Sequence, residues 1–464
     1  MTQKEAVNNK LWNKIQDFDF DSPMSEYGFS TRLANENYWT RNFTEEAILE
    51  YKKFMYLAAT SDFMVSPSEI VDVVWHQHLI FTQSYQNFCN LIEKQVQHIP
   101  STHNREDFVR FKQAKERTTE LYTKTFGEQP KAIWNYSDMY ESLNLEKANL
   151  KIRTFLVGGI LSFLVLTVPF YFVLRPLYVN LNNPYFMLAF VGLIFCTFIG
   201  LEIYNRNALH KIIYQFNSDS FVFNLQALEL VFMKTQKLEK VINGYVNEFV
   251  KKKQIRIHEN NTVEKVAEFN DLSKEAFQIS DVFKLKGRAY YSDIQGYLLN
   301  KPIFNNTVNC VDALKKYFIK SKKFGWLFYI NFGVLALLLM TGVIRLTTGV
   351  LRGKAVDLIL MADLMLVTAI IFYLNRLTKL VCTVTIPKLY EEEILPRREK
   401  KESWEWKYFI YGDGVITTPF VTLVNSKSDS SFSSDGGSSS SSSSSCGSSC
   451  GSSCSSCGGC GGGD

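Results

Sequence analysis

Two long apolar stretches decide the fold class of this chain: TFLVGGILSFLVLTVPFYFVL at residues 154–174 and PYFMLAFVGLIFCTFIGL at residues 184–201. Two more follow at residues 324–344 and 356–374, and only the last contains charged side chains, those of Asp357 and Asp363. About twenty apolar residues in a helix that rises ~1.5 Å per residue cross a hydrocarbon core of ~30 Å. Because the four stretches form two closely spaced pairs, we expect two transmembrane hairpins, at residues 154–204 and 324–374.

The composition of the whole chain is that of an ordinary protein, with 46% hydrophobic residues and 51 Lys+Arg against 46 Asp+Glu among 464 residues. It excludes the collagen-like, fully disordered and small disulfide-scaffold classes. The small basic excess does not indicate nucleic-acid binding. We expect a mainly α protein with a helical N-terminal domain, four transmembrane helices in two hairpins, a small winged-helix-like α+β segment between the hairpins, and a disordered C-terminal tail. The segments outside the hairpins are a helical domain at residues 1–146, a basic α+β domain at 205–322, a juxtamembrane linker at 380–424 and the tail at 425–464.

The basic residues that flank the apolar stretches predict the orientation in the membrane, since Lys and Arg gather on the cytoplasmic side. One side carries ten of them: Lys147, Lys151, Arg153, Arg206, Lys211, Lys320, Lys322, Lys323, Arg376 and Lys379. The other side carries Arg175, Arg345, Arg352 and Lys354. We therefore expect an inner- or plasma-membrane protein whose N-terminus, central segment and C-terminus are cytoplasmic.

The N-terminal domain shows apolar residues at helical spacing, which predicts helices near residues 3–16, 45–60, 67–96 and 105–125. Ser66 is the expected cap of the third helix, with Pro67 at its first position. Asp72 and His76 are four residues apart and share one face, as in a carboxylate that orients an imidazole. In an unbroken helix Cys89 would lie about 20 Å from His76, too far to share a metal ion.

Aromatic and potential ligand side chains recur through this third helix in the pattern D-x-x-W-H…T-x-x-Y-x-x-F-C…H-x-P. The pattern is formed by Asp72, Trp75, His76, Thr82, Tyr85, Phe88, Cys89, His98 and Pro100. It resembles the glycine-rich domain-containing protein-like family, whose members carry a similar W-H…Y…C helix, over residues 10–130. The resemblance implies a domain and no particular reaction.

Three interpretations of Asp72, Trp75, His76, Tyr85, Cys89 and His98 remain open: buried core packing, a binding pocket, and a catalytic site. Core packing would pair their polar tips inside a helical domain. The enzyme alternative needs Asp72, His76 and His98 to converge on a cleft. The chain contains no Gly-rich phosphate loop and no nucleophile elbow.

The central segment, residues 205–322, is basic, and its expected order of helix, helix and β segment is that of a winged-helix unit. Residues 150–380 also resemble an uncharacterised bacterial membrane-protein family with Gly/Cys-rich tails and a G-x-x-R-G-x-P-V turn. Here residues 349–356 match this turn except that Ala355 replaces the Pro. The basic charge favours contact with anionic lipid, because Lys320, Lys322 and Lys323 adjoin a membrane span. A protein-contact surface is the alternative, and no nucleic acid is expected.

One acidic residue, Asp363, lies near the middle of the fourth span, where a carboxylate costs about 2.5–3.5 kcal/mol on insertion scales. It indicates either an ion or proton path, or a protonated or packed side chain that faces another helix near Asn331 of the third span. The first interpretation makes the protein a transporter or channel component.

The tail contains only Gly, Ser and Cys over residues 436–463, so it has no apolar side chain to bury and should be disordered. Five cysteines lie close together at Cys446, Cys450, Cys454, Cys457 and Cys460. Thiolates at this density suit zinc or another soft metal. An inert tether is the alternative.

These features together predict a non-catalytic, membrane-anchored scaffold or sensor. Its N-terminal domain would bind a protein or small-ligand partner, and its thiol-rich tail would respond to metal or redox state. The alternatives are a transporter or channel component that uses the spans around Asp363, and an enzyme with a pocket around Asp72, His76 and His98.

Overall fold

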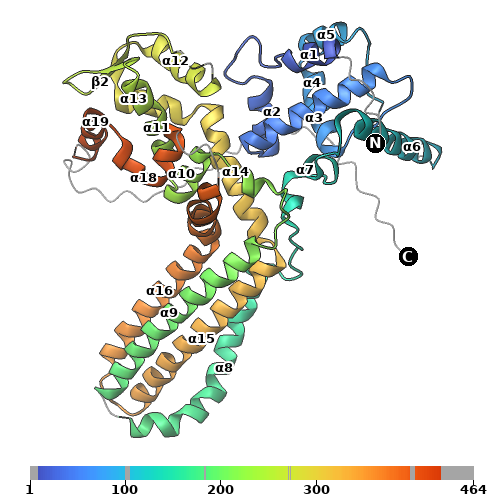
Figure 1. The fold of residues 1–464 in the computed structure, drawn as a ribbon. Coiled ribbons are helices and arrows are strands. Elements are labelled where there is room, and N and C mark those ends of the chain that lie inside the picture. The colour runs from blue at the N-terminus through green and yellow to red at the C-terminus, as the bar shows by residue number, and fades with distance from the viewer. Residues whose placement is uncertain are drawn as a thin grey trace.

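The computed structural model describes residues 9–99, 105–181, 184–269, 271, 273–397 and 403–429. It is mainly helical, with 76% helix and 3% strand, which confirms the expected fold class. A long helical bundle extends away from a head made of two lobes that lie side by side (Figure 1).

The bundle contains four helices that are long and apolar enough to cross a membrane, as the four apolar stretches predicted. They are α8 (Ile152–Asn180), α9 (Tyr185–Ile213), α15 (Lys322–Leu351) and α16 (Asp357–Leu380). Helix α15 packs against the other three, and 44% of its most apolar window is buried, against none in α8. The apolar faces of the outer helices are therefore left for lipid.

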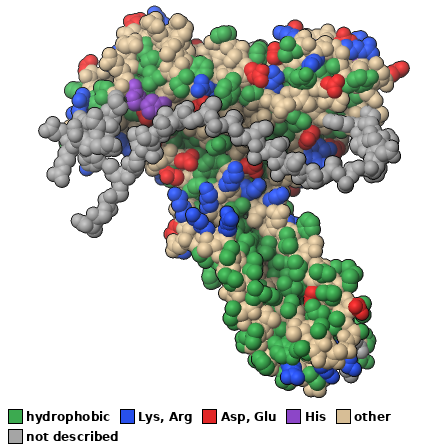
Figure 2. Space-filling view, turned by 180° about the vertical axis from the view of Figure 1, so that it is seen from behind, with side chains coloured by type: hydrophobic (Ala, Val, Ile, Leu, Met, Phe, Trp, Pro, Cys, Tyr) green, Lys and Arg blue, Asp and Glu red, His purple; other side chains and the backbone are tan. Residues whose placement is uncertain are grey.

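Basic side chains gather where the bundle meets the head, and a smaller group lies at the far end of the bundle (Figure 2). The helix bounds place Arg153, Arg206 and Lys322 at the head end and Arg352 at the far end. The surface between the two groups is rich in hydrophobic side chains (Figure 2). This banding is the pattern of a protein that lies in a lipid bilayer.

The N-terminal lobe is wholly helical in its described residues. Its elements are α1 (Asn9–Asp17), α2 (Phe29–Asn37), α3 (Arg41–Thr60), α4 (Glu69–Ile80), α5 (Thr82–Leu91), α6 (Arg105–Phe126), α7 (Lys131–Trp134) and a 3-10 turn (Met139–Leu143). The expected cap at Ser66 is wrong: the Ser68 side chain accepts from Val71 N, and helix α4 begins at Glu69. Ser66 N donates instead to Thr118 Oγ1 at 2.8 Å, which ties the preceding segment to α6.

The second lobe is built from the central segment and contains one small antiparallel sheet. Its helices are α10 (Ala227–Thr235), α11 (Leu238–Lys251), α12 (Lys274–Lys286), α13 (Tyr291–Leu299) and α14 (Pro302–Ile319). Its strands are β1 (Ile255–Ile257), β2 (Thr262–Lys265) and β3 (Ala289–Tyr290), in the order β1-β2-β3. Arg256 pairs with Glu264, and Val263 pairs with Ala289. The expected order of helix, helix and strand is found in α10, α11 and β1, although the first helix begins at Ala227 and follows a 3-10 turn at Phe221–Asn224.

The chain beyond the fourth span returns to the second lobe. Helix α16 continues through π-helical turns and α17 (Ile386–Leu389) to Arg397, and α18 (Trp404–Tyr411) and α19 (Thr418–Asp429) follow. The segment expected as a juxtamembrane linker ends in helix α19, in which Phe420 and Leu423, three residues apart, are buried on one helical face. The helix also continues past residue 425, where disorder was expected to begin. The five tail cysteines lie outside the described residues.

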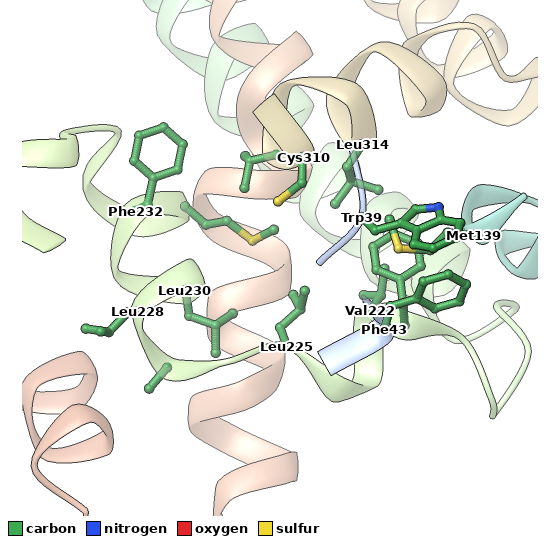
Figure 3. Packing of buried hydrophobic residues seen from close by; sticks show 14 of the residues in the cluster. Trp39, Phe43, Met139, Val222, Leu225, Leu228, Leu230, Phe232, Cys310 and Leu314 are labelled. Atoms are coloured by element: carbon green, nitrogen blue, oxygen red, sulfur yellow. The ribbon is translucent and has the colours of Figure 1, made fainter. Parts of the chain in front are cut away.

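A single hydrophobic core joins both lobes and reaches the head ends of the membrane helices. Trp39, Phe43 and Met139 of the N-terminal lobe lie beside Val222 (Figure 3). Leu225, Leu230, and Cys310 and Leu314 of α14 belong to the same core. Tyr390, in the extension of α16, donates to Val222 O at 2.9 Å and accepts from Leu225 N at 2.6 Å. The lobes are thus packed as one body on top of the bundle.

Candidate metal centre

The helix expected at residues 67–96 is broken at Phe81, where φ −86° and ψ 61° interrupt the α conformation. Phe81 N donates to His78 O, and Tyr85 N donates to Phe81 O as α5 begins. The pattern of apolar residues continues through the break, so periodicity alone predicts one helix. The break redirects α5 and brings the segment after it, which carries His98, back toward α4.

Asp72, His76 and His98 converge at this place, as the enzyme alternative required. One potential ligand atom from each lies within 4.8 Å of the others. His98 Nε2 is 2.9 Å from Asp72 Oδ1, and His76 Nδ1 is 3.7 Å from Asp72 Oδ2. The two imidazole rings lie 4.4 Å apart, centroid to centroid.

The three side chains lie in one surface groove, lined also by Trp75, Glu69 and Lys94. His98 is mostly buried, with 19% of its side chain exposed, whereas His76 is 57% exposed. The cluster therefore has one mostly buried imidazole, one carboxylate and one imidazole that faces solvent.

Trp75 and Tyr85 hold the segment that carries His98. The Trp75 ring packs edge-on against the His98 ring at 4.7 Å, and its Nε1 donates to Tyr85 Oη at 3.2 Å. Tyr85 Oη in turn donates to the carbonyl of Val96. Lys94 Nζ anchors the same segment by donating to Ala58 O and Ser61 O, both at 2.8 Å. These residues orient His98 and are not themselves ligands.

Cys89 and His78 belong to the core and not to this cluster. Cys89 is 2% exposed, and it is not among the three ligand residues. His78 is fully buried between Tyr51 Oη, 2.9 Å from its Nδ1, and Ser84 Oγ, 3.2 Å from its Nε2. Burial lowers the pKa of His78 to about 3, so this imidazole is neutral.

The donor set of the cluster suits a divalent transition metal. Two imidazole nitrogens and one carboxylate oxygen are ligands of zinc and of other borderline ions. Ligand atoms bound to one zinc ion at ~2.0–2.2 Å stand about 3–3.6 Å from each other. The separations of 2.9 Å and 3.7 Å are near this range, although each is to a different oxygen of Asp72. One ligand atom from each residue lies within 4.8 Å of the others, so a bound ion would draw the three together.

A buried polar cluster that the sequence did not single out lies in the core of the N-terminal lobe, around Glu50. Its Oε2 accepts from Tyr122 Oη at 2.7 Å and from Trp134 Nε1 at 2.8 Å, and its Oε1 accepts from Lys53 Nζ at 2.7 Å. Glu50 occupies a core position of α3, between Ala47 and Phe54. A charged residue inside an apolar helical stripe is the signal that could have revealed it.

In the bundle, Asn331 and Asp363 do not contact the same partner. Asn331 exchanges hydrogen bonds of 2.8 and 2.7 Å with Asn205 of α9, which also donates to Tyr373 Oη at 2.9 Å. Asp363 is 6% exposed, lies against Gly342, and accepts no hydrogen bond from the described residues. Asn331 and Gly342 are eleven residues apart on α15, about 16 Å along its axis. The expectation that Asp363 packs near Asn331 is therefore wrong.

A family model described as UCP032817-like matches residues 14–118, a minority of the chain that includes Asp72, His76 and His98. This family is uncharacterised, so the similarity assigns no activity to the N-terminal region. No curated protein and no solved structure matches the chain.

Proposed function

We propose that this protein is a membrane-anchored sensor or scaffold whose N-terminal lobe binds a divalent transition-metal ion through Asp72, His76 and His98. The protein lies in an inner or plasma membrane with its head in the cytoplasm. The thiol-rich tail adds a second metal- or redox-responsive element, and the head presents a surface to a protein partner.

The observation that carries the metal site is the meeting of three ligand atoms within 4.8 Å, one of them from His98, 26 residues along the chain from Asp72. Asp72 and His76 come from one face of α4, and His98 comes from the segment after α5. Three protein ligands leave at least one position on the ion open to water, to a ligand or to a side chain of a partner. An open coordination position would let the bound ion contact a ligand or a protein partner directly, which suits a sensor or a scaffold.

The position of the site suits signalling because an ion would join a surface segment to a core helix. Helix α4 buries Ile70, Val71 and Val74 in the core that both lobes share. Binding would hold the His98 segment against α4 and stabilise this arrangement, by an amount that grows with the metal concentration relative to the Kd of the site.

Zinc binding to the full-length protein in detergent tests the proposal by isothermal titration calorimetry. The background for all variants carries Cys446→Ser, Cys450→Ser, Cys454→Ser, Cys457→Ser and Cys460→Ser, so that tail thiolates do not contribute. We expect one equivalent of zinc to bind, and His98→Ala to weaken binding by at least about tenfold. His210→Ala is the matched control, because His210 also faces a carboxylate, Glu393 at 3.6 Å, but belongs to no three-ligand cluster in the described residues.

Absence of zinc binding to the parent protein, or equal affinity in His98→Ala, would refute the metal site.

The orientation is tested separately with a membrane-impermeant maleimide in intact cells. In a background that otherwise lacks cysteine, Lys354→Cys should be labelled, whereas Lys323→Cys should react only after permeabilisation. The reverse pattern would place the head outside the cytoplasm.

The same convergence favours one second candidate, a metal-dependent hydrolase. A metal-bound water in the open position could act as a nucleophile if a base lies within hydrogen-bond reach. Glu69 is a carboxylate of the same groove and the candidate for that base. Zinc-dependent hydrolysis that is lost in Glu69→Gln while zinc affinity is unchanged would favour the enzyme over the sensor.

A further inference from the structure

A separate cavity lies at the junction of the two lobes, away from the metal-ligand cluster. Helices α2 and α3 of the N-terminal lobe form one wall, and α10, α11, α12 and α14 of the second lobe form the other. Its volume is about 70 Å³, smaller than a drug-sized site but enough for a ligand of a few non-hydrogen atoms. Asn35 of α2 bridges the walls by donating to Pro302 O at 3.2 Å.

The charges around this cavity favour a cation. Its lining contains three acids, Glu45, Glu229 and Glu275, and two bases, Arg41 and Lys274. Lys274 is neutralised by Asp21, which lies outside the lining, at 2.8 Å. Arg41 is shared between Glu275 at 2.6 Å and Glu45 at 3.0 Å. One base thus remains for three acids.

Two buried oxygen atoms of the lining residues accept no hydrogen bond within the described part of the chain. Glu275 Oε2 and Asn306 Oδ1 accept no hydrogen bond from the described residues, and their residues are 6% and 9% exposed. The opposite atoms of both groups are already used, since Glu275 Oε1 pairs with Arg41 and Asn306 Nδ2 donates to Trp39 O at 3.0 Å. A buried acceptor without a partner costs about 1–3 kcal/mol, so this arrangement calls for a hydrogen-bond donor.

The remaining wall is apolar and aromatic. Tyr245 and Phe304 present a T-shaped pair of rings with centroids 5.8 Å apart, and Leu228 and Val241 lie beside them. An aromatic face attracts a cation, and aliphatic walls accept a short alkyl chain.

We propose that this cavity binds a small organic ammonium ion, a primary amine on a short aliphatic chain. Its N–H groups donate to Glu275 Oε2 and Asn306 Oδ1, and its alkyl part packs against Phe304 and Leu228. The ligand contacts both lobes and therefore stabilises their junction. Helix α14 carries Asn306 and Phe304 and leads through Ser321 directly into α15. A ligand bound in the cavity would therefore also stabilise the position of α14 at the head end of the bundle. This inference does not depend on the metal site.

The test uses the full-length protein in detergent with a chelator present, and putrescine as the probe. Calorimetry measures its affinity, and thermal unfolding measures the stability of the complex. 1,4-Butanediol is the neutral control of similar length. We expect putrescine to bind and to raise the unfolding midpoint, and the diol to do neither. Absence of putrescine binding, or equal effects of the two compounds, would show that the cavity holds only solvent and would overturn the proposal.

Two variants locate the binding. Glu275→Gln removes the charge that the ammonium faces and should weaken putrescine binding by at least about tenfold. Thr307→Met places a larger side chain in the cavity lining and keeps both members of the Arg41–Glu275 pair, so it should abolish binding even if Glu275→Gln proves unstable. Glu259→Gln, at an exposed site, is the matched control. Unchanged affinity in Thr307→Met would refute this location.

Discussion

Trp134 Nε1 donates a hydrogen bond to Glu50 Oε2 across 2.8 Å in the interior of the N-terminal lobe. The same carboxylate accepts from Tyr122, and its other oxygen pairs with Lys53. Through this group, α3 is bonded to both α6 and α7. One buried anion thus organises the lobe that carries the metal-ligand cluster.

Glu50→Ala should destabilise the protein by about 3 kcal/mol, because it leaves two buried donors and one ammonium without their acceptor. The measurement is the thermal unfolding midpoint of the full-length protein in detergent. Glu36→Ala is the control, since Glu36 forms only an exposed i,i+4 pair with Arg32 and should cost less than about 1 kcal/mol. Equal shifts for the two variants would contradict the structural role of Glu50.

His78 should make the protein less stable in acid. Its folded-state pKa is lowered from 6.5 to about 3 by burial, so between these values the unfolded chain binds a proton that the folded chain does not. Stability from this residue is therefore present above pH 6.5 and is lost as the pH falls from 6.5 toward 3. The fall in unfolding midpoint from about pH 7.5 to about pH 5 should be smaller in His78→Gln than in the wild type. His210→Gln, at a half-exposed site, should show the same fall in unfolding midpoint as the wild type. If His78→Gln also shows the wild-type fall, His78 is not the acid-sensitive group.

Gly342→Ala should disrupt the bundle. A Cβ at this position would collide with the Asp363 carboxylate and lie 2.9 Å from Phe190 Cζ. Overpacking of this kind costs about 1–3 kcal/mol. Gly333→Ala on the same helix meets no atom within 4 Å and should be tolerated. The two variants are compared by thermal unfolding in detergent, and equal stability would argue against the close approach of α15 and α16 at Gly342.

Asn205 and Asn331 should be energetically coupled, since they exchange two hydrogen bonds between α9 and α15. Hydrogen bonds between membrane helices contribute about 1 kcal/mol. A double-mutant cycle with Asn205→Ala and Asn331→Ala, read from unfolding in detergent, should give a coupling of this size. Additive effects would mean that the two amides do not interact.

The sequence alone predicted the main features of the architecture, namely the four membrane helices and the α+β segment between them. The four membrane helices follow from apolar stretches of the right length, a local property that each segment carries by itself. The basic α+β segment, with its two helices before a strand, was predicted from periodicity in the same way. Two errors fell where one residue decides the local structure: the cap at Ser68 and not Ser66, and the break at Phe81. A third is the helix at residues 418–429, which continues past the expected start of the tail.

The candidate site could be predicted only in part. The i,i+4 spacing placed Asp72 beside His76 correctly, because a helix repeats every 3.6 residues. That His98 joins them depends on the turn at Phe81 and on the bond from Tyr85 to the Val96 carbonyl. Neither contact leaves a periodic signal in the sequence.

Hydrophobicity and spacing, which act within a helix, were enough to establish from the sequence that the chain is helical and has four membrane-length spans. Tertiary packing alone decided that His98 meets Asp72, that Asn331 pairs with Asn205 and not Asp363, and that Glu275 faces a cavity between the lobes. The physical reason is that these contacts join residues from 26 to 126 positions apart in the chain, or from different lobes. Their distances are set by how the shared core packs, which no single segment encodes.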